Sequence, residues 1–222
     1  MAKVSNCWYE SVCNKVTPQC QTGCTRFKEM KYLMEHSNLP PNKQVPQVLN
    51  APKVDLEAYR HLAEIKSNIV DFVENGNNLY IASHNTGNGK TSWAIKLMLK
   101  YFDEVWAGNG FKPRALFIPV SQFLLKNKDF KRVDDEFEDL KELLPKVDLV
   151  VWDDVGSSEL SAYDYTSLLM YIDARTANCK ANIFTGNLET FEEVREKVGM
   201  KIADRIFSNN IDVVVFKERS LR

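Results

Sequence analysis

Residues 79–94 combine the residue types that bind phosphate groups. A short apolar run leads into a turn that contains two glycines and ends in Gly89-Lys90-Thr91. Glycines let backbone N–H groups turn towards a phosphate, and the N-terminus of the following helix adds positive charge there. In such a loop Lys90 would neutralise the β- and γ-phosphates of a nucleotide, and the hydroxyl of Thr91 would ligate Mg²⁺. The expected cradle comprises His84, Asn85, Thr86, Gly87, Asn88, Gly89, Lys90, Thr91 and Ser92.

His84 stands where the G-x-x-x-x-G-K-[ST] pattern has its first glycine. A histidine that had to adopt a positive φ there would be strained, and nucleotide affinity would suffer. The alternative is that Gly89-Lys90-Thr91 falls by chance in an ordinary turn. The apolar strand before the turn and the helical pattern after it favour the phosphate-binding loop.

A pair of carboxylates ends a second apolar run, at 147–155. The carboxyl ends of parallel strands meet at the ligand crevice, so Asp153 is expected to hold Mg²⁺ together with Thr91. Asp154 is expected to orient or deprotonate the attacking water. An aspartate at that place has a short reach, which predicts slow hydrolysis. The alternative is a strand that ends in two solvated aspartates.

Three further polar residues follow later elements. Asn187 comes after an apolar run at 182–185 and is expected to hydrogen-bond the lytic water or the γ-phosphate, unless it belongs to a simple turn. Arg205 lies on a late helix and could reach a neighbouring subunit's nucleotide as an arginine finger, or could form a surface salt bridge. Arg222 could touch a phosphate in cis or belong to a frayed basic tail.

Four cysteines lie close together near the N-terminus, at Cys7, Cys13, Cys20 and Cys24. Four thiolates can close a tetrahedral Zn²⁺ site and stabilise a module too small to fold alone. The spacing lacks the usual C-x2-C pair, so an iron–sulfur cluster and plain buried cysteines stay open as alternatives.

The spacing of apolar residues predicts the elements that position these side chains. Strands are expected at 79–83, 115–120, 149–152, 182–185 and 211–216, and helices at 55–74, 90–102, 134–144, 162–176 and 191–207, the last as one or two helices. Alternating strands and helices imply right-handed crossovers. We therefore expect an α/β fold with a mostly parallel sheet flanked by helices.

The chain divides by composition into three parts. Residues 1–36 form a small Cys-rich module, residues 37–54 form a Pro-rich linker, and residues 55–222 form the nucleotide-binding domain. Prolines at the linker cannot lie inside a helix or a central strand.

Charge and hydropathy exclude some classes of function. The net charge is −1 and the sequence pI is about 6.3, which argues against a protein held on nucleic acid by bulk charge alone. No apolar run approaches the ~20 residues of a membrane helix, and the N-terminus lacks an apolar signal core. The sequence therefore predicts a soluble, cytoplasmic protein without membrane partners.

The motifs together resemble those of DnaC/DnaI-type replicative helicase loaders, a branch of the AAA+ ATPases related to IstB-like transposition ATPases. The resemblance covers about residues 55–222. It rests on Gly87-Asn88-Gly89-Lys90-Thr91, Val150-Val151-Trp152-Asp153-Asp154-Val155-Gly156, Ile172-Asp173-Ala174-Arg175, Thr185-Gly186-Asn187-Leu188, Ala203-Asp204-Arg205-Ile206 and Ser220-Leu221-Arg222. In the family these segments are Walker A, Walker B, a helix that follows it, sensor 1, the arginine-finger segment and a terminal S-x-R. Only six residues follow the last predicted strand, which resembles this branch in leaving no C-terminal lid domain.

The resemblance implies an ATPase, with ATP and Mg²⁺ as ligands, that acts as a switch. Its ATPase domain would contact single-stranded DNA and self-associate through Arg205. The N-terminal module, zinc-binding as in DnaI-type loaders, would grip a DnaB-type replicative helicase. The small size is similar to that of phage-encoded loaders. Two alternatives stay open: an IstB-like transposition ATPase, whose relatives usually lack the cysteine module, and a nucleotide-binding adaptor with little hydrolysis.

Overall fold

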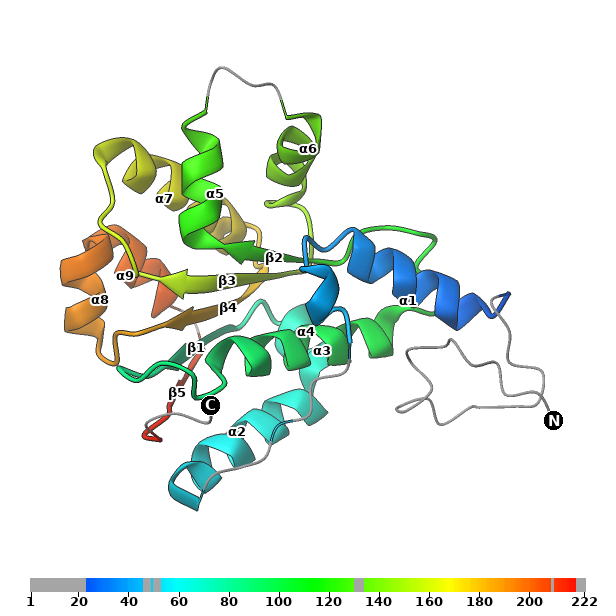
Figure 1. Cartoon of the computed structure of the whole chain (residues 1–222), viewed down its shortest axis with the longest axis horizontal. Helices are drawn as coiled ribbons and strands as arrows, with labels where there is room; N and C mark the ends of the chain where they lie inside the picture. The colour runs from blue at the N-terminus through cyan, green and yellow to red at the C-terminus, as the bar shows by residue number, and fades with distance from the viewer. Residues whose placement is uncertain (1–22, 46–48, 50–52, 130–133, 209, 219–222) are drawn as a thin grey trace.

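A five-stranded parallel sheet forms the centre of the computed structural model, which describes residues 23–45, 49, 53–129, 134–208 and 210–218 (Figure 1). The strands are β1 (Asn78–Ala82), β2 (Ala115–Pro119), β3 (Leu149–Val155), β4 (Ala181–Gly186) and β5 (Ile211–Val215). Their order is β2-β3-β4-β1-β5, and each neighbouring pair is parallel. The predicted α/β fold with a parallel sheet is confirmed.

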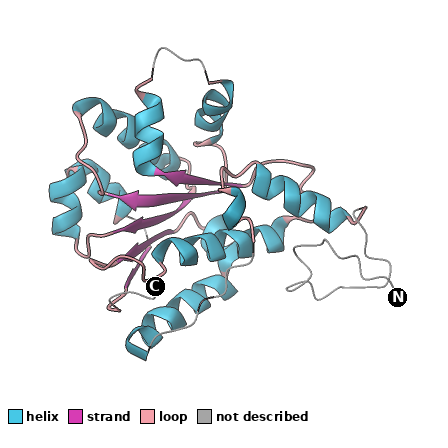
Figure 2. Cartoon of the chain, in the orientation of Figure 1, coloured by secondary structure: helices cyan, strands magenta, loops and turns pink. Residues whose placement is uncertain are grey.

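Helices cover both faces of the sheet (Figure 2). They are α1 (Thr25–Glu35), α2 (Leu56–Ser67), α3 (Ile69–Glu74), α4 (Lys90–Val105), α5 (Val120–Asn127), α6 (Asp135–Leu143), α7 (Ala162–Ala177), α8 (Phe191–Val198) and α9 (Met200–Ile206). Short 3-10 turns lie at Pro41–Lys43 and Lys53–Asp55. In Figure 1, α1 to α4 lie on one side of the sheet and α5 to α9 on the other.

Alternating strand residues feed two hydrophobic cores. On β3, Leu149 and Val151 pack into the core beneath α1 to α4, whereas Val150 and Trp152 pack into the core beneath α5 to α9. This follows from the two-residue period of a strand, which sends successive side chains to opposite faces. Because both faces are covered, most of β1 and the first four residues of β3 form continuous apolar runs rather than alternating patterns.

Two predictions differ from the structure, and the choice left open at 191–207 is decided in favour of two helices. The helix expected at 55–74 is two helices, because at Asn68 the backbone leaves helical geometry (φ −112°, ψ 31°) and the side-chain amide bonds the Glu64 carbonyl at 3.2 Å. Helix α5 was not predicted. Its eight residues follow β2 directly, so the sequence offers little turn signal between strand and helix. The helical region at 191–207 divides at Gly199, where φ is +88°.

Helix α1 and the residues after it pack onto the main domain. Met30, Leu33 and Met34 belong to the same hydrophobic core as α4. Beyond the helix, the Phe117 N–H donates to the Ser37 carbonyl at 2.8 Å, and the Asn38 amide donates to the Phe117 carbonyl at 2.8 Å. These contacts cover the open edge of β2, which an unpaired strand would leave exposed. The division into 1–36, 37–54 and 55–222 stays a prediction, but residues 25–39 are packed against the sheet.

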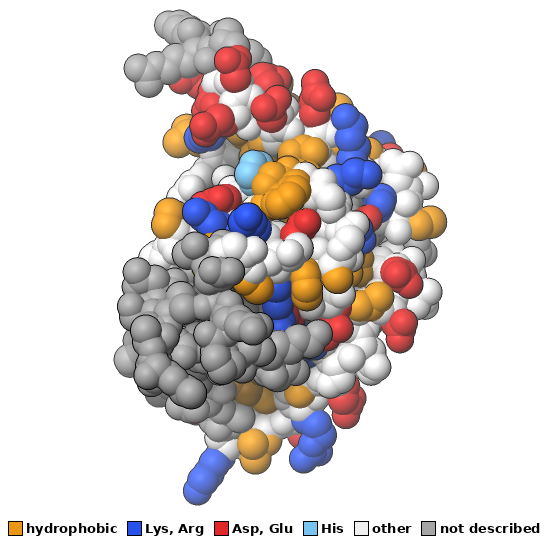
Figure 3. Space-filling view, turned by 90° about the vertical axis from the view of Figure 1, so that its right-hand side faces the viewer, with side chains coloured by type: hydrophobic (Ala, Val, Ile, Leu, Met, Phe, Trp, Pro, Cys, Tyr) orange, Lys and Arg blue, Asp and Glu red, His pale blue; other side chains and the backbone are white. Residues whose placement is uncertain are grey.

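The surface above the sheet is acidic at one end. Figure 3 shows red side chains gathered at the top of the molecule, where Figure 1 places α6. This helix has Asp135, Glu136 and Glu138 in its first turn. Such charges at a helix N-terminus interact favourably with its dipole and keep the face solvated.

Across the described residues, no helix is long and apolar enough to cross a membrane.

Candidate functional site

The glycine-containing turn leaves the carboxyl end of β1 and runs directly into α4. β1 lies between β4 and β5, so the turn emerges from an inner strand of the sheet. Gly87 and Gly89 have φ values of +75° and +97°, in the left-handed region where only glycine is unstrained. Gly89 is the N-cap of α4, whose N-terminus therefore points its dipole into the turn. This arrangement is that of a phosphate-binding loop.

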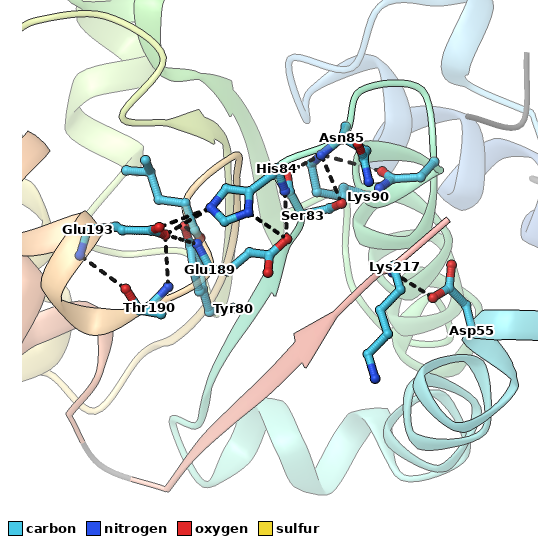
Figure 4. Close-up of polar contacts among 12 residues, drawn as sticks. Asp55, Tyr80, Ser83, His84, Asn85, Lys90, Glu189, Thr190, Glu193 and Lys217 are labelled. Atoms are coloured by element: carbon cyan, nitrogen blue, oxygen red, sulfur yellow. Dashed lines mark hydrogen bonds and ion pairs between the residues drawn. The ribbon is translucent and has the colours of Figure 1, made fainter. Parts of the chain in front are cut away.

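Lys90 lies inside this loop and is 9% exposed as a residue. Its Nζ donates to the carbonyl oxygens of Asn85 at 2.8 Å and Ser83 at 3.2 Å, and to Asn88 Oδ1 at 3.4 Å (Figure 4). Burial lowers the pKa of Lys90, and the charges of Asp154, Asp153 and Glu189 oppose that effect. The ammonium group is thus placed where loop and strand ends converge.

The polar atoms of the loop fit an anionic ligand. Asn88 is 1% exposed, and its amide nitrogen has no hydrogen-bond partner among the described residues. A buried donor without an acceptor costs free energy, which an added phosphate oxygen would recover. Lys90, Asn88 and the helix N-terminus therefore offer positive charge and donors to one small volume.

Asp153 meets Thr91 at the end of β3. The Thr91 hydroxyl donates to Asp153 Oδ1 at 2.8 Å, and the Thr185 hydroxyl donates to the same oxygen at 2.7 Å. Burial raises the pKa of Asp153, while the two hydroxyl groups lower it. Hydroxyl and carboxylate oxygens are the ligands that Mg²⁺ prefers, so Thr91 and Asp153 fit the predicted metal pair. Thr185 was not assigned a role from sequence, although its place at a strand end next to Asp153 was a signal.

Asp154 has an unusual backbone and a defined partner. Its φ is +62°, and the pairing of β3 with β4 is irregular between Trp152 and Val155. The Asp154 N–H donates to the Thr185 hydroxyl at 2.9 Å, and Asn187 Nδ2 donates to Asp154 Oδ1 at 3.1 Å. Strained residues held by their surroundings concentrate at functional sites. The two residues predicted to handle water are therefore in contact.

His84 turns away from the cradle. Its Nε2 lies 3.0 Å from Glu193 Oε1 and its Nδ1 lies 3.2 Å from Glu189 Oε1 (Figure 4). His84 is not among the non-glycine residues with positive φ, so the expected strain at this position is absent. Substitution of the first glycine is therefore compatible with the loop.

Arg205 lies at the other end of the sheet. Its carbonyl oxygen accepts from the Asn78 amide at 2.9 Å, at the start of β1, whereas the phosphate loop follows the end of that strand. Its Nε donates to Asp173 Oδ1 on α7 at 2.5 Å. A strand of five residues spans roughly 16 Å. Arg205 is therefore not placed to contact the site of its own chain.

Several predicted ligands fall outside the described residues. These are Cys7, Cys13, Cys20 and Arg222. Cys24 is described and exposed. In the described ranges, no group of three or more His, Cys, Asp or Glu side chains is arranged to hold a metal ion.

Arg175 is fully buried at the end of the sheet opposite the phosphate loop. From sequence it was assigned only to a motif. Arg175 donates to Asn182 Oδ1 at 2.7 Å and to the carbonyl oxygens of Leu144, Val147, Asp148 and Ala181 at 2.6, 2.9, 3.2 and 2.6 Å. Burial lowers the pKa of Arg175 to about 9, and Asp148 partly offsets the shift. These bonds satisfy all five guanidinium N–H groups.

A family model described as IstB-like ATP binding protein matches residues 10–222. The chain belongs to this IstB-like family. The match spans the glycine-containing turn, both aspartates and the late helices. A comparison of the sequence with curated proteins finds no match.

Solved structures similar to this IstB-like chain include replication proteins. The DnaC helicase loader shares 18% identity over 77% of this chain and 94% of its own, with a TM-score of 0.61. DnaI shares 14% over 80% and 94%, with a TM-score of 0.61. A primosome component from Streptococcus pyogenes serotype M3 shares 15% over 86% and 98%, with a TM-score of 0.62. At these identities the likeness shows a shared fold.

Proposed function

We propose that this IstB-like protein binds Mg·ATP and hydrolyses it slowly, and that this cycle controls delivery of a DnaB-type replicative helicase onto single-stranded DNA. One observation carries the ATP-dependent part. The Thr91 hydroxyl and the Asp153 carboxylate come from different elements yet meet at 2.8 Å beside the buried Lys90. The ATP-binding description of the family supports the choice of nucleotide.

Nucleotide binding would replace weak internal contacts of the loop. Lys90 would exchange its bonds to the Ser83 and Asn85 carbonyls for charged phosphate oxygens, which accept stronger hydrogen bonds. Thr91 and Asp153 would hold Mg²⁺, which when bound neutralises charge on the β- and γ-phosphates. Thr185 fixes the Asp153 oxygen that faces Thr91.

Hydrolysis would use the pair at the ends of β3 and β4. Asp154 would orient a water and accept its proton while the water oxygen attacks the γ-phosphorus. The bond from that phosphorus to the bridging oxygen breaks, leaving ADP and phosphate. Asn187 holds the Asp154 carboxylate at 3.1 Å and so limits its rotation. The aspartate's short side chain accounts for the slow rate in this proposal.

Self-association would complete the site with Arg205 from a second copy of the chain. Arg205 lies on α9 at the end of the sheet away from the loop, where its side chain is 42% exposed and paired with Asp173. An arginine in this place can reach a phosphate only across a subunit contact. Arg222 is proposed to touch a phosphate in cis. The chain leading towards it is held by Asp55, which accepts from the Lys217 N–H at 2.7 Å (Figure 4).

The helicase and DNA partners rest on likeness to known loaders and initiators. The DnaC helicase loader shares the fold, as does DnaA solved with AMPPCP and single-stranded DNA at 13% identity and a TM-score of 0.58. The two lysines at the end of α5 are paired with carboxylates, so the DNA contact is expected elsewhere on the domain. Lys126 pairs with Asp134 at 3.2 Å and Lys128 with Asp164 at 2.6 Å, which offsets their charge.

The cysteine cluster is proposed to bind zinc and to form part of the helicase contact. Elemental analysis of the purified full-length protein should find about one zinc ion per chain. Absorbance near ~400 nm would instead identify an iron–sulfur cluster. Protein purified without chelator that carries neither metal would exclude both.

A second candidate function is that of an IstB-like transposition ATPase, which the family match favours. Size-exclusion chromatography with the cognate replicative helicase separates the two. The loader should co-elute with the helicase, more tightly with ATP than without. A chain that binds DNA in an ATP-dependent way but never co-elutes with the helicase would be assigned to transposition. Absence of steady-state ATPase activity, with or without single-stranded DNA, would reduce the protein to a nucleotide-binding adaptor.

A further inference from the structure

The start of the phosphate loop is tied to the segment that follows β4. The His84 N–H donates to Glu189 Oε1 at 2.8 Å, and its ring nitrogens face Glu189 and Glu193. Residue 84 is the first residue of the predicted cradle, and Glu189 lies two residues after Asn187. The contacts therefore join the two segments that carry Lys90 and Asn187.

The ring of His84 lies between two carboxylates. Its Nε2 is within hydrogen-bond distance of Glu193 Oε1, and carboxylates only accept hydrogen bonds, so Nε2 is the donor. Its Nδ1 lies 3.2 Å from Glu189 Oε1, so a protonated ring would pair with both anions. Glu193 is further fixed because the Glu189 N–H donates to it at 2.6 Å and the Thr190 N–H at 3.2 Å. The Glu189 amide lowers the pKa of Glu193 most, and His84 and the Thr190 amide lower it further.

Glu189 also interacts with Lys90. Its charge, together with those of Asp154 and Asp153, raises the pKa of Lys90 against the effect of burial. A carboxylate this close to the loop competes with phosphate for the ammonium group and repels the phosphate directly. A cation beside Glu189 reduces both effects.

We propose that His84 is a positioning residue of the nucleotide site, which anchors the start of the phosphate loop to the β4–α8 segment and offsets the charge of Glu189 and Glu193. The proposal rests on the proposed ATP binding and adds a residue to it. A glycine at position 84 could supply the backbone contact to Glu189 but neither of the ring contacts.

A double-mutant cycle tests this. His84→Ala should raise the Kd for Mg·ATP about five- to ten-fold, measured by titration calorimetry on the full chain. In ATPase assays the change should fall on KM more than on kcat, because His84 touches no reacting atom. In a Glu189→Gln background the same His84→Ala change should cost no more than about two-fold, since the carboxylate that His84 offsets is gone.

A matched control is His61, which makes a similar histidine–carboxylate contact away from the loop. Its Nε2 lies 2.8 Å from Asp212 Oδ1, between α2 and β5. His61→Ala should leave the Kd within about two-fold of the wild-type value. A comparable loss in His61→Ala and His84→Ala would overturn the proposal, because it would reflect general loosening of the domain.

A conservative variant adds a readout that loss of packing alone would not change. His84→Gln keeps a side-chain donor that can reach Glu193, and it should recover part of the affinity for Mg·ATP that His84→Ala loses. A His84→Gln protein that binds Mg·ATP no better than His84→Ala would overturn the contribution of the contact to Glu193.

The outcomes are distinguishable. A wild-type chain that binds no Mg·ATP overturns the proposed function. A wild-type chain that binds Mg·ATP while His84→Ala binds it equally well overturns the role of His84 alone. Equal penalties for His84→Ala with and without Glu189→Gln would also overturn it.

Discussion

Lys90 and Arg175 are both buried cations, yet they lie at opposite ends of the sheet and are bonded in opposite ways. Arg175 is fully buried, and each of its N–H groups has a protein acceptor. The Lys90 ammonium group has three acceptors, at 2.8, 3.2 and 3.4 Å. Beside it, the amide nitrogen of Asn88 has no hydrogen-bond partner among the described residues. The hydrogen bonds around Arg175 are complete within the protein, whereas the site around Lys90 has a donor left for a ligand.

The same contrast holds for the backbone around each cation. Near Arg175 the guanidinium gathers carbonyl oxygens from the starts of β3 and β4 and fixes those strands. Near Lys90 the backbone adopts positive φ at Gly87, Gly89 and Asp154. A buried charge thus serves structure where its partners are saturated, and binding where the backbone is shaped around an open position.

The largest expected effect is on the stability of the protein, at the Arg175 network. Arg175→Met should lower the free energy of unfolding by at least about 3 kcal/mol, because it removes a buried guanidinium that donates to the carbonyl oxygens of several segments and to Asn182 Oδ1. Denaturant unfolding measures the change. Arg175→Lys, with three donors, should recover part of the loss. An Arg175→Met protein as stable as wild type would show that the network contributes little.

The next largest effect is on the binding of Mg·ATP, at Lys90. Lys90→Ala should weaken Mg·ATP binding by at least about 100-fold, since charged hydrogen bonds to phosphate are lost. Its unfolding free energy should stay close to the wild-type value, because two of the three Lys90 contacts are long, at 3.2 and 3.4 Å, and burial of the ammonium group offsets the gain from the third. Calorimetric titration and thermal unfolding of one protein sample check both parts. A large loss of stability in this variant would break the contrast with Arg175.

A smaller effect is expected at Thr185, which bonds both the metal-site carboxylate and the Asp154 backbone. Thr185→Val should reduce ATPase activity about ten-fold and raise the Mg²⁺ concentration needed for half-maximal rate, because partners of metal ligands orient them. Thr166→Val on α7, where the hydroxyl bonds a carbonyl of its own helix, is a matched control and should retain the wild-type rate. An unchanged Mg²⁺ dependence in Thr185→Val would remove Thr185 from the metal site.

The smallest effect concerns the pH dependence of stability. Burial raises the folded-state pKa of Asp153, so its charged form destabilises the ligand-free protein at neutral pH. Asp153→Asn should therefore raise the unfolding free energy by about 0.5–1 kcal/mol at pH 7 while abolishing Mg²⁺-dependent ATPase activity. The gain should shrink as pH falls through the folded pKa of Asp153 and vanish near pH ~4, the pKa of an unfolded aspartate. A gain that grew on acidification would contradict the assigned direction.

The sequence predicted the site around Lys90 better than the hydrogen-bond network around Arg175, for a physical reason. Lys90, Thr91, Asp153, Asp154 and Asn187 occupy local motifs at strand ends, and parallel strands bring such ends together. The structure does bring these residues together, with roles that stay to be measured. Arg175 could not be predicted in this way because its acceptors come from segments up to 31 residues apart in the chain.

The same limit applies to residues whose direction depends on distant partners. His84 faces Glu189 and Glu193, which are 105 and 109 residues away, so its departure from the cradle had no local signal. The break at Asn68 and the short helix α5 likewise depend on weak local preferences that packing decides.

Titration of Mg·ATP into the folded full-length chain, with Lys90→Ala and Arg175→Lys measured beside it, tests the contrast between the two cations most directly. The account predicts binding of about one nucleotide per chain in wild type and in folded Arg175→Lys, and none in equally folded Lys90→Ala. A folded wild-type chain that takes up no Mg·ATP, or a Lys90→Ala chain that binds it as tightly as wild type, would contradict the account.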